Sequence, residues 1–531
     1  MKRKSYIIVL VCCLLNLLSQ AQSMFQKSMG GIDDESGFFI QQCSDHGFAF
    51  GGFTQNYGDG IYLLKTDSLA SLQWSRIYHG GSHQDQGYSV QQTADGGFII
   101  GGYTKSFASS GYNATLIKTN ATGDTLWTGL YGGSLNDFCN VVRQTSDGGY
   151  IMAGYTTTYR TGSDSAGIYL IKTGQLGDVK WSKSLGGNYN ITDAYSIVQT
   201  SDKGFMITGY TNAFAEPNGD AFLLKTDSLG NPLFTKTYGF KGSDWGNSMQ
   251  QTSDGGFIIT GGYSTDSTSN DIDILAIRTD ANGDTLWVHT FGGPAFECGQ
   301  SVRQAPDGTF IIGGYTISYG AGNFDALLLK LDANGNQLHE YTYGATGDDE
   351  GNAVFATNRG GYVLCGNSNS FNGGTYYDVY LVKTDSMLNS GCKQALIPNN
   401  KRSHHVIAGS GSMLSAATPT VRKAAPYTVS SGVLVTDACT YVGINEQNQA
   451  SGVFVFPNPA TGYVTIRVAE YNGKQVLVTL KSILGNTVYQ RYETSAEYGI
   501  TIPLEDQASG IYLLEVSDGQ GRITTKLQIQ K

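Results

Sequence analysis

The sequence predicts an all-β protein, a seven-bladed β-propeller followed by a small immunoglobulin-like β-sandwich. The first observation is a repeated segment, seen most clearly as GYSVQQTADGGFIIGGYT at Gly87–Thr104 and NSMQQTSDGGFIITGGYS at Asn247–Ser264. Its glycine landmarks recur roughly every 50 residues, at Gly30, Gly80, Gly132, Gly186, Gly239, Gly292 and Gly344. A period of this length, rich in strand signals and without a long helical pattern, is typical of a propeller or a solenoid.

Each repeat contains four expected strands. In the second repeat they are Tyr88–Thr93, Phe98–Tyr103, Thr115–Thr119 and Leu126–Tyr131, and all are short and rich in β-branched or aromatic residues. Asp95-Gly96 separates the first two strands, and Asp-Gly accepts the positive φ of a tight hairpin turn. Antiparallel four-stranded units repeated in tandem are the blades of a propeller.

The ends of the repeat array predict a closed ring. The last repeat runs through a third strand at Val379–Thr384 and then loses the pattern, without an aromatic fourth strand. The missing strand stands at the other end, where Met24–Gly31 resembles Leu126–Gly133. We therefore expect the N-terminal segment to pair with Val379–Thr384 and close the ring, which also hides two strand edges.

Four segments are expected along the chain: a signal peptide at 1–21, the propeller at 22–391, a connector at 392–451 and a C-terminal domain at 452–531. The signal peptide has a basic start at Lys2, Arg3 and Lys4, an apolar stretch, and the small-x-small site Ser19-Gln20-Ala21. The connector is rich in Ser, Ala, Thr, Lys and Asn and is expected to be irregular.

The cysteines are interpreted in the light of export. Cys392 and Cys439 flank the connector and are predicted to form a disulfide, which exported proteins retain. The other cysteines of the expected mature chain each replace a repeat residue in a different blade and are expected to be unpaired; they are Cys43, Cys139, Cys298 and Cys365.

The last 80 residues contain seven short strand candidates with regular turn signals, which fits a β-sandwich. Their landmarks are Phe456-Pro457-Asn458-Pro459, Leu484-Gly485-Asn486, Ser509-Gly510-Ile511-Tyr512 and Lys526-Leu527. In this order at a C-terminus they resemble the type A sorting domain of the type IX secretion system. The resemblance covers 452–531 and implies export through the periplasm and outer membrane, contact with the secretion machinery, and release or attachment at the cell surface. Pro457, Asn458, Pro459, Gly510, Tyr512 and Lys526 are the expected sorting-signal residues. The repeat array resembles uncharacterised arrays that accompany such domains, and this second resemblance implies no activity.

Repeated residues are interpreted as architectural, because a site formed by a ring needs different residues from different blades. Trp74, Trp127, Trp181 and Trp287 are expected to pack between blades. Acidic residues precede the first strand of several repeats, at Asp85, Asp137, Asp244, Glu297 and Asp349, with Asp34 nearby in the first repeat. They are expected to accept hydrogen bonds from their own loops, with a ring that holds Ca²⁺ as the alternative.

The loops between the second and third strands differ among repeats and are the expected ligand-binding face. Their aromatic residues, set among Ser, Asn and Gly, are Tyr57, Phe107, Tyr159, Phe214, Tyr319, Phe371 and Tyr376. Rigid aromatic surface beside small polar groups suits adaptable recognition. The alternative is that these side chains pack their own loops.

Composition and motifs narrow the function further. The net charge of −10 offers no basic footprint for nucleic acid. There is no HExxH or GxSxG motif, and His79 and His83 supply at most half a metal site. We therefore predict a monomeric, secreted or cell-surface binding module without a catalytic site or cofactor, whose ligand is a glycan, a peptide or a surface protein. The alternative is a propeller glycosidase or lyase of the same cargo class, because a carboxylate pair cannot be recognised from spacing alone.

Overall fold

The computed structural model describes most of the chain beyond the expected signal peptide. The described residues are 23–55, 59–80, 84–107, 110–160, 166–186, 191–213, 218–239, 241–264, 271–358, 360–402, 407–411, 414–417, 428–430, 434–442, 453–456, 462–468, 474–482, 486–494, 500–504, 506–518 and 522–529. The expected signal peptide therefore lies outside them. The chain divides into two compact units, a ring within Gln22–Gly443 and a C-terminal unit that contains Ile444–Lys531. Among the described residues, no helix is long and apolar enough to cross a membrane.

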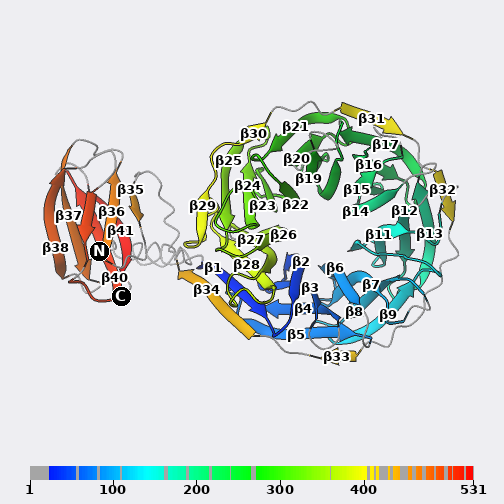
Figure 1. Cartoon of the computed structure of the whole chain (residues 1–531), viewed down its shortest axis with the longest axis horizontal. Helices are drawn as coiled ribbons and strands as arrows, with labels where there is room; N and C mark the ends of the chain where they lie inside the picture. The colour runs from blue at the N-terminus through cyan, green and yellow to red at the C-terminus, as the bar shows by residue number, and fades with distance from the viewer. Residues whose placement is uncertain are drawn as a thin grey trace, which may run out of the picture. The chain divides into compact units, whose positions relative to one another are not determined.

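Seven antiparallel blades form the ring (Figure 1). From the innermost strand outward, blades one to three are β2 Glu35–Gln42, β3 Phe48–Thr54, β4 Gly60–Thr66, β5 Leu72–His79; β6 Asp85–Gln92, β7 Phe98–Thr104, β8 Asn113–Thr119, β9 Thr125–Tyr131; and β10 Val141–Gln144, β11 Tyr150–Thr156, β12 Gly167–Thr173, β13 Val179–Gly186. Blades four and five are β14 Thr192–Gln199, β15 Phe205–Thr211, β16 Asp220–Thr226, β17 Pro232–Gly239; and β18 Trp245–Gln251, β19 Phe257–Ser264, β20 Ile272–Thr279, β21 Thr285–Phe291. Blades six and seven are β22 Glu297–Gln304, β23 Phe310–Thr316, β24 Asp325–Leu331, β25 Gln337–Tyr343; and β26 Asp349–Ala356, β27 Tyr362–Ser368, β28 Asp378–Thr384, with β1 Ser23–Gly30 as its fourth strand. The predicted seven-bladed propeller is confirmed.

The repeated Gln-Gln-Thr segment joins neighbouring blades through side-chain hydrogen bonds. The second glutamine accepts a backbone N–H from the hairpin turn of the preceding blade, as Gln92 does from Ser44 at 2.9 Å. Gln42 of blade one accepts from Asn358 of blade seven at 3.1 Å, so the same bond spans the closure of the ring. The first glutamine accepts from the next blade, as Gln91 does from Gln144 N–H at 2.6 Å. The bond to the second glutamine recurs at five of the described blade interfaces, so the repeated motif has an architectural role.

Aromatic residues of the fourth strand also fasten each blade to the next. Tyr131 donates its hydroxyl to the Gly177 carbonyl at 2.9 Å, and Tyr78, Tyr238 and Tyr343 make the equivalent bond. Trp127 donates its indole N–H to the Gln175 carbonyl of the next blade at 3.1 Å. Trp127 and Tyr150 of the next blade also pack edge to face, at 5.7 Å between ring centroids. The four predicted tryptophans, Trp74, Trp127, Trp181 and Trp287, therefore pack between blades.

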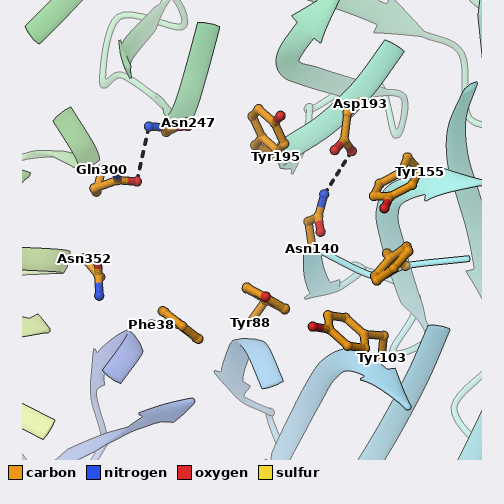
Figure 2. Close-up of a pocket in the computed structure, with 11 residues that line it drawn as sticks. Phe38, Tyr88, Tyr103, Asn140, Tyr155, Asp193, Tyr195, Asn247, Gln300 and Asn352 are labelled. Carbon is orange, nitrogen blue, oxygen red and sulfur yellow. Dashed lines mark hydrogen bonds between the residues drawn. The ribbon is translucent and has the colours of Figure 1, made fainter. Parts of the chain in front are cut away.

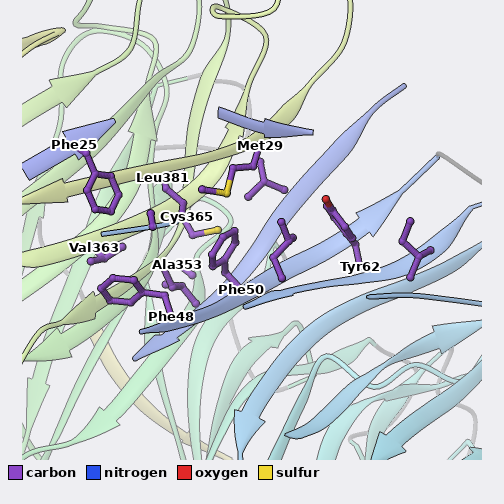
Figure 3. Close-up of a cluster of buried hydrophobic side chains, with 14 residues drawn as sticks. Phe25, Met29, Phe48, Phe50, Tyr62, Ala353, Val363, Cys365 and Leu381 are labelled. Atoms are coloured by element: carbon purple, nitrogen blue, oxygen red, sulfur yellow. The ribbon is translucent and has the colours of Figure 1, made fainter. Parts of the chain in front are cut away.

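The N-terminal strand closes the ring in the predicted register. β1 pairs antiparallel with β28, with Phe25 opposite Lys383 and Met29 opposite Val379. Phe25 and Met29 are buried against Phe48 and Leu381, in a cluster that joins blades seven and one (Figure 3). The closure therefore combines strand pairing with apolar burial.

The connector differs from the irregular segment that we expected. It forms six short strands: β29 Gln394–Leu396, β30 Lys401–Arg402, β31 Ile407–Gly411, β32 Leu414–Ala417, β33 Thr428–Ser430 and β34 Leu434–Val442. Each adds a fifth, outer strand to one blade, in the order six, five, four, three, one and seven, so the segment follows the circumference of the ring (Figure 1). We call residues 394–442 the belt. Its strands were not expected because edge strands are held by main-chain hydrogen bonds and need little apolar alternation.

The belt extends the ring past the predicted boundary at residue 391, because Gln22–Gly443 forms one compact unit. Its longest strand, β34, pairs with the whole of β1, from Ser23 opposite Val442 to Gly30 opposite Leu434. The N-terminal strand that closes the ring is thus itself covered by β34.

The C-terminal unit is the expected sandwich of seven strands. One sheet contains β35 Val453–Phe456, β36 Tyr463–Val468 and β39 Ile500–Pro503; the other contains β37 Gln475–Ser482, β38 Thr487–Thr494, β40 Gly510–Ser517 and β41 Arg522–Ile529. Its core includes Val464, Val478, Leu514 and Leu527, all with no exposed surface. This core is separate from the cores of the blades, so the sandwich has its own source of stability.

Candidate ligand-binding site

The innermost strands carry a β-bulge near their first residues, and the bulges place one side chain per blade at the axis. In blade two, Gly87 and Ser89 are paired with β7 while Tyr88 is left unpaired between them. The same shift occurs in five other blades, and Asn140 stands at the matching point just before β10. The side chains so placed are Phe38, Tyr88, Asn140, Tyr195, Asn247, Gln300 and Asn352, and all line one cavity (Figure 2). Bulges re-aim side chains in this way beside functional sites.

Aromatic rings form one side of this cavity, which we call the axial pocket. Phe38 stacks on Tyr88 at 5.1 Å between ring centroids, and Tyr88 lies 5.6 Å from Tyr103. Phe138 follows, 4.6 Å from Tyr103 and 4.5 Å from Tyr155. Blades one to three thus present a continuous aromatic wall.

Carboxamides form the opposite side of the axial pocket, from blades five to seven (Figure 2). Asn247 donates to the Gln300 side-chain oxygen at 3.2 Å, and Asn352 donates to the Gly37 carbonyl at 3.1 Å. These bonds fix the orientation of the amides, and each amide can both donate and accept further hydrogen bonds. The pocket therefore offers a flat apolar surface opposite fixed polar groups.

One carboxyl group, Asp193, lies in the lining of the axial pocket. Asn140 bridges blades three and four by donating to Asp193 at 2.9 Å and to the Ala194 carbonyl at 3.0 Å. Burial raises the pKa of Asp193 to about 8, although the bonds from Ala194 N–H and Asn140 lower it. The fold therefore favours the protonated form of Asp193, whose hydroxyl would add a hydrogen-bond donor to the pocket.

The axial pocket has a volume of about 380 Å³ and lies toward the face of the variable loops. That face follows from chain direction, because the bulge residues stand near the start of the inner strands and the Asp-Gly turns follow their ends. The sequence analysis predicted this face as the ligand-binding face but did not identify the bulge residues that line the pocket. A signal was available: the residue after Gly87 is Tyr, whereas the residue after Gly246 is Asn, within otherwise matching segments.

The predicted loop aromatics mostly pack within the ring. Tyr159 donates to the Gly132 carbonyl at 3.1 Å and contacts a buried cluster, and Tyr319 contacts another. Phe371 lies 5.4 Å from Tyr380, and Phe107 packs over Gly80. Of the described loop aromatics, Tyr376 is the most open, with 40% of its surface exposed. Tyr57 and Phe214 lie outside the described residues.

The acidic residues before the inner strands hold the loops between blades. Asp137 accepts from Gly133 N–H at 2.8 Å and from the Thr158 hydroxyl at 2.7 Å. Similar bonds are made by Asp85, Asp244, Glu297 and Asp349. In blade one the equivalent residue is Glu35, which accepts from Gly31 N–H at 2.9 Å, rather than Asp34. Within the described part of the chain, no group of three or more His, Cys, Asp or Glu residues is placed to hold a metal ion.

The cysteines agree with the expectations as far as the structure describes them. Cys43, Cys139, Cys298 and Cys365 are free and buried. Cys392 is disulfide-bonded. Gln26 donates to the Cys392 carbonyl and is the register partner of Cys439 in β34, so both expected cysteines lie beside the same residue. Their pairing with each other stays a prediction. His83 lies outside the described residues, so the half metal site with His79 does too.

The sorting-signal residues lie in the C-terminal sandwich. Gly510 begins β40, and Tyr512 is buried, with its hydroxyl donating to the Ala508 carbonyl at 2.9 Å. Lys526 stands opposite Leu513 in β41. Pro457, Asn458 and Pro459 lie outside the described residues.

Residues 454–530 match the family of secretion system C-terminal sorting domains. The chain is a cargo protein of the type IX secretion system. Its destination is the cell surface or the extracellular space, and its sandwich is the part that the secretion machinery recognises. No curated protein matches this cargo protein by sequence.

Solved structures resemble the cargo protein only distantly. The WD40 domain of Pan2 from Neurospora crassa is 12% identical, with a TM-score of 0.42, over 68% of this chain and 96% of that one. A GH43_12 protein retrieved from a capybara gut metagenome is 11% identical, with a TM-score of 0.27, over 96% of both chains.

Proposed function

We propose that the exported ring is a saccharide-binding module whose site is the axial pocket. The observation that carries this proposal is the division of the pocket into an aromatic wall and a carboxamide wall. A sugar ring has flat C–H faces that suit aromatic surface, and its hydroxyl groups both donate and accept, as carboxamides do. The wall from Phe38 to Tyr155 supplies the aromatic surface. The side chains of Asn247, Gln300 and Asn352 supply the hydrogen-bond donors and acceptors.

The same chemistry weighs against a peptide ligand as the first choice. A peptide in an extended form pairs its backbone with an open strand edge. In the axial pocket the inner strands present bulged residues, and Phe38, Tyr195 and Gln300 stand between the backbone and the axis. A compact ring-shaped ligand fits about 380 Å³ better than an extended chain does.

We also favour a binding function over a catalytic one. Glycoside hydrolysis by the usual route uses two carboxyl groups on opposite sides of the scissile bond. The described lining of the axial pocket supplies Asp193. If the ring were a glycosidase or lyase instead, the protonated Asp193 would be its acid, and an Asp193→Asn variant would bind the sugar but release no product.

The test is a glycan array with the purified ring, residues 22–443, followed by calorimetry with the best-bound oligosaccharide. Tyr88→Ala removes the centre of the aromatic wall and should weaken binding at least about fivefold, because stacking on such a ring is worth on the order of 1–3 kcal/mol. Asn352→Ala should weaken it by a smaller factor, through lost hydrogen bonds.

Tyr376→Ala is the matched control, since it removes an exposed aromatic from the rim of the same face. The control should bind normally. Normal binding by Tyr88→Ala together with loss of binding by Tyr376→Ala would transfer the site to the loops, as the sequence alone suggests. Release of reducing ends during the assay would favour the enzyme.

A further inference from the structure

A second cavity of about 130 Å³ continues the channel beyond the axial pocket and shares its ring of bulge residues. Two arginines line it, Arg143 on β10 and Arg303 on β22. Each stands three residues after its blade's bulge residue, and strands rise about 3.3 Å per residue. This part of the channel therefore lies about 10 Å closer to the Asp-Gly turn face.

These arginines depart from the repeat. At the same position, blades one, two and five have glutamine, at Gln41, Gln91 and Gln250. Gln91 and Gln250 each accept a backbone N–H from the next blade, at 2.6 and 2.8 Å. An arginine cannot accept a hydrogen bond, so blades three and six each lose one architectural bond by having arginine there.

The two guanidinium groups have neutral partners only, among the described residues. Arg143 donates to the Ser89 hydroxyl at 3.0 Å and to the Val142 carbonyl at 2.8 Å. Arg303 donates to the Val302 carbonyl at 2.6 Å. These bonds use one terminal nitrogen of each group, and no ion pair joins either arginine to a described carboxylate. Each guanidinium keeps further N–H donors, and both side chains line the cavity.

The electrostatics agree with the geometry. Burial, and to a smaller extent the charge of Arg143, lower the pKa of Arg303 to about 10. Burial also lowers the pKa of Arg143. Two like charges that share a channel and lack a counter-charge are costly, and a bound anion would offset that cost.

We infer that this part of the channel binds an oxyanion of the carboxylate, sulfate or phosphate class, held between Arg143 and Arg303. Serine hydroxyls from several blades line the same cavity and add donors; they are Ser89, Ser196, Ser248 and Ser301. Arginine is the residue that suits such anions, because its N–H groups match two oxygens at once. The anion is either free in solution or carried by the ligand of the axial pocket, and the site stands without the proposed sugar binding.

The test uses the full mature chain, residues 22–531, and inorganic sulfate as the probe. Sodium sulfate should raise the Tm of the wild-type ring by about 2 °C or more relative to sodium chloride at matched ionic strength, because a ligand that binds only the folded state stabilises it. Arg303→Gln should remove this rise. It should also raise the Tm measured without sulfate, because the like-charge repulsion is relieved. Glutamine is the residue that three blades already have at this position, so the variant is expected to fold.

Arg491→Gln is the matched control, since it removes the same charge from the surface of the C-terminal sandwich. It should keep the full response to sulfate. An equal rise in chloride and sulfate would mean simple screening and would overturn the site, as would an unchanged response in Arg303→Gln.

Two further competition measurements distinguish an anion carried by the ligand from one that is free in solution. If the ligand carries it, an oligogalacturonate should compete with sulfate while its methyl ester does not; if it is free, neither should compete. Tyr103→Ala distinguishes this inference from the proposed function, because Tyr103 lines the axial pocket but not the second cavity. This variant should weaken sugar binding and leave the sulfate response intact.

Discussion

At the scale of single residues, the residues with unusual properties are those that differ from their equivalents in other blades. Asp193 is one of them. Its pKa of about 8 lies well above the usual value of a carboxyl group, because burial disfavours the charged form. An acid whose pKa is raised by folding stabilises the folded state fully at low pH. That contribution is lost as the pH rises from about 4, the unfolded value, to about 8.

Asp193→Asn should therefore change how the stability of the ring depends on pH. Between pH 5 and pH 8, wild-type stability should fall by up to about 1 kcal/mol per pH unit from this group, and the variant should lack that part of the decline. Urea unfolding of residues 22–443 at pH 5 and pH 8 measures it. Asp147→Asn is the control: the bonds from Thr145 and Lys172 hold the pKa of Asp147 at about 2 despite partial burial, so its effect lies below pH 5. Equal pH profiles for wild type and Asp193→Asn would contradict the protonated state of Asp193.

At the scale of strands and loops, the sequence predicts those structural features that occur in several copies of the repeat. The strand positions, the closing register of Phe25 opposite Lys383, and the role of Trp127 all follow from comparing copies. The belt could not be predicted this way, because each of its strands occurs once and depends on backbone groups rather than side-chain pattern. The axial pocket was missed for a related reason. A bulge is a shift of strand register, and the residue types at Gly87, Tyr88 and Ser89 do not predict one.

The belt changes the expected effect of shortening the chain. A chain that ends at Gly443 should melt as one cooperative unit, whereas one that ends at Gly391 exposes the edge of β1 and loses every belt strand. Each backbone hydrogen bond contributes about 0.5–1.5 kcal/mol net, so the shorter chain should lose several kcal/mol. Calorimetry of both chains measures the difference. Cys392→Ser in the longer chain shows how much of it comes from the disulfide. Equal Tm values for the two chains would mean that the belt adds nothing to closure.

At the scale of the whole molecule, folding and delivery are assigned to different units. The ring has its own buried clusters, closed by β1 and covered by β34, while the sandwich has a separate core around Val478 and Leu514. Removal of residues 452–531 should therefore leave the melting curve of the ring unchanged, since domains with their own cores fold alone.

In a host with the type IX system, the same deletion should leave the protein in the periplasm, because the sorting domain at 454–530 is what the machinery recognises. Cell fractionation with an antibody to the ring measures where the protein accumulates. Lys474→Gln, which breaks an exposed ion pair with Asp518, should be delivered normally and controls for surface charge. Delivery of the deleted chain to the surface or the medium would place the export signal in the ring instead.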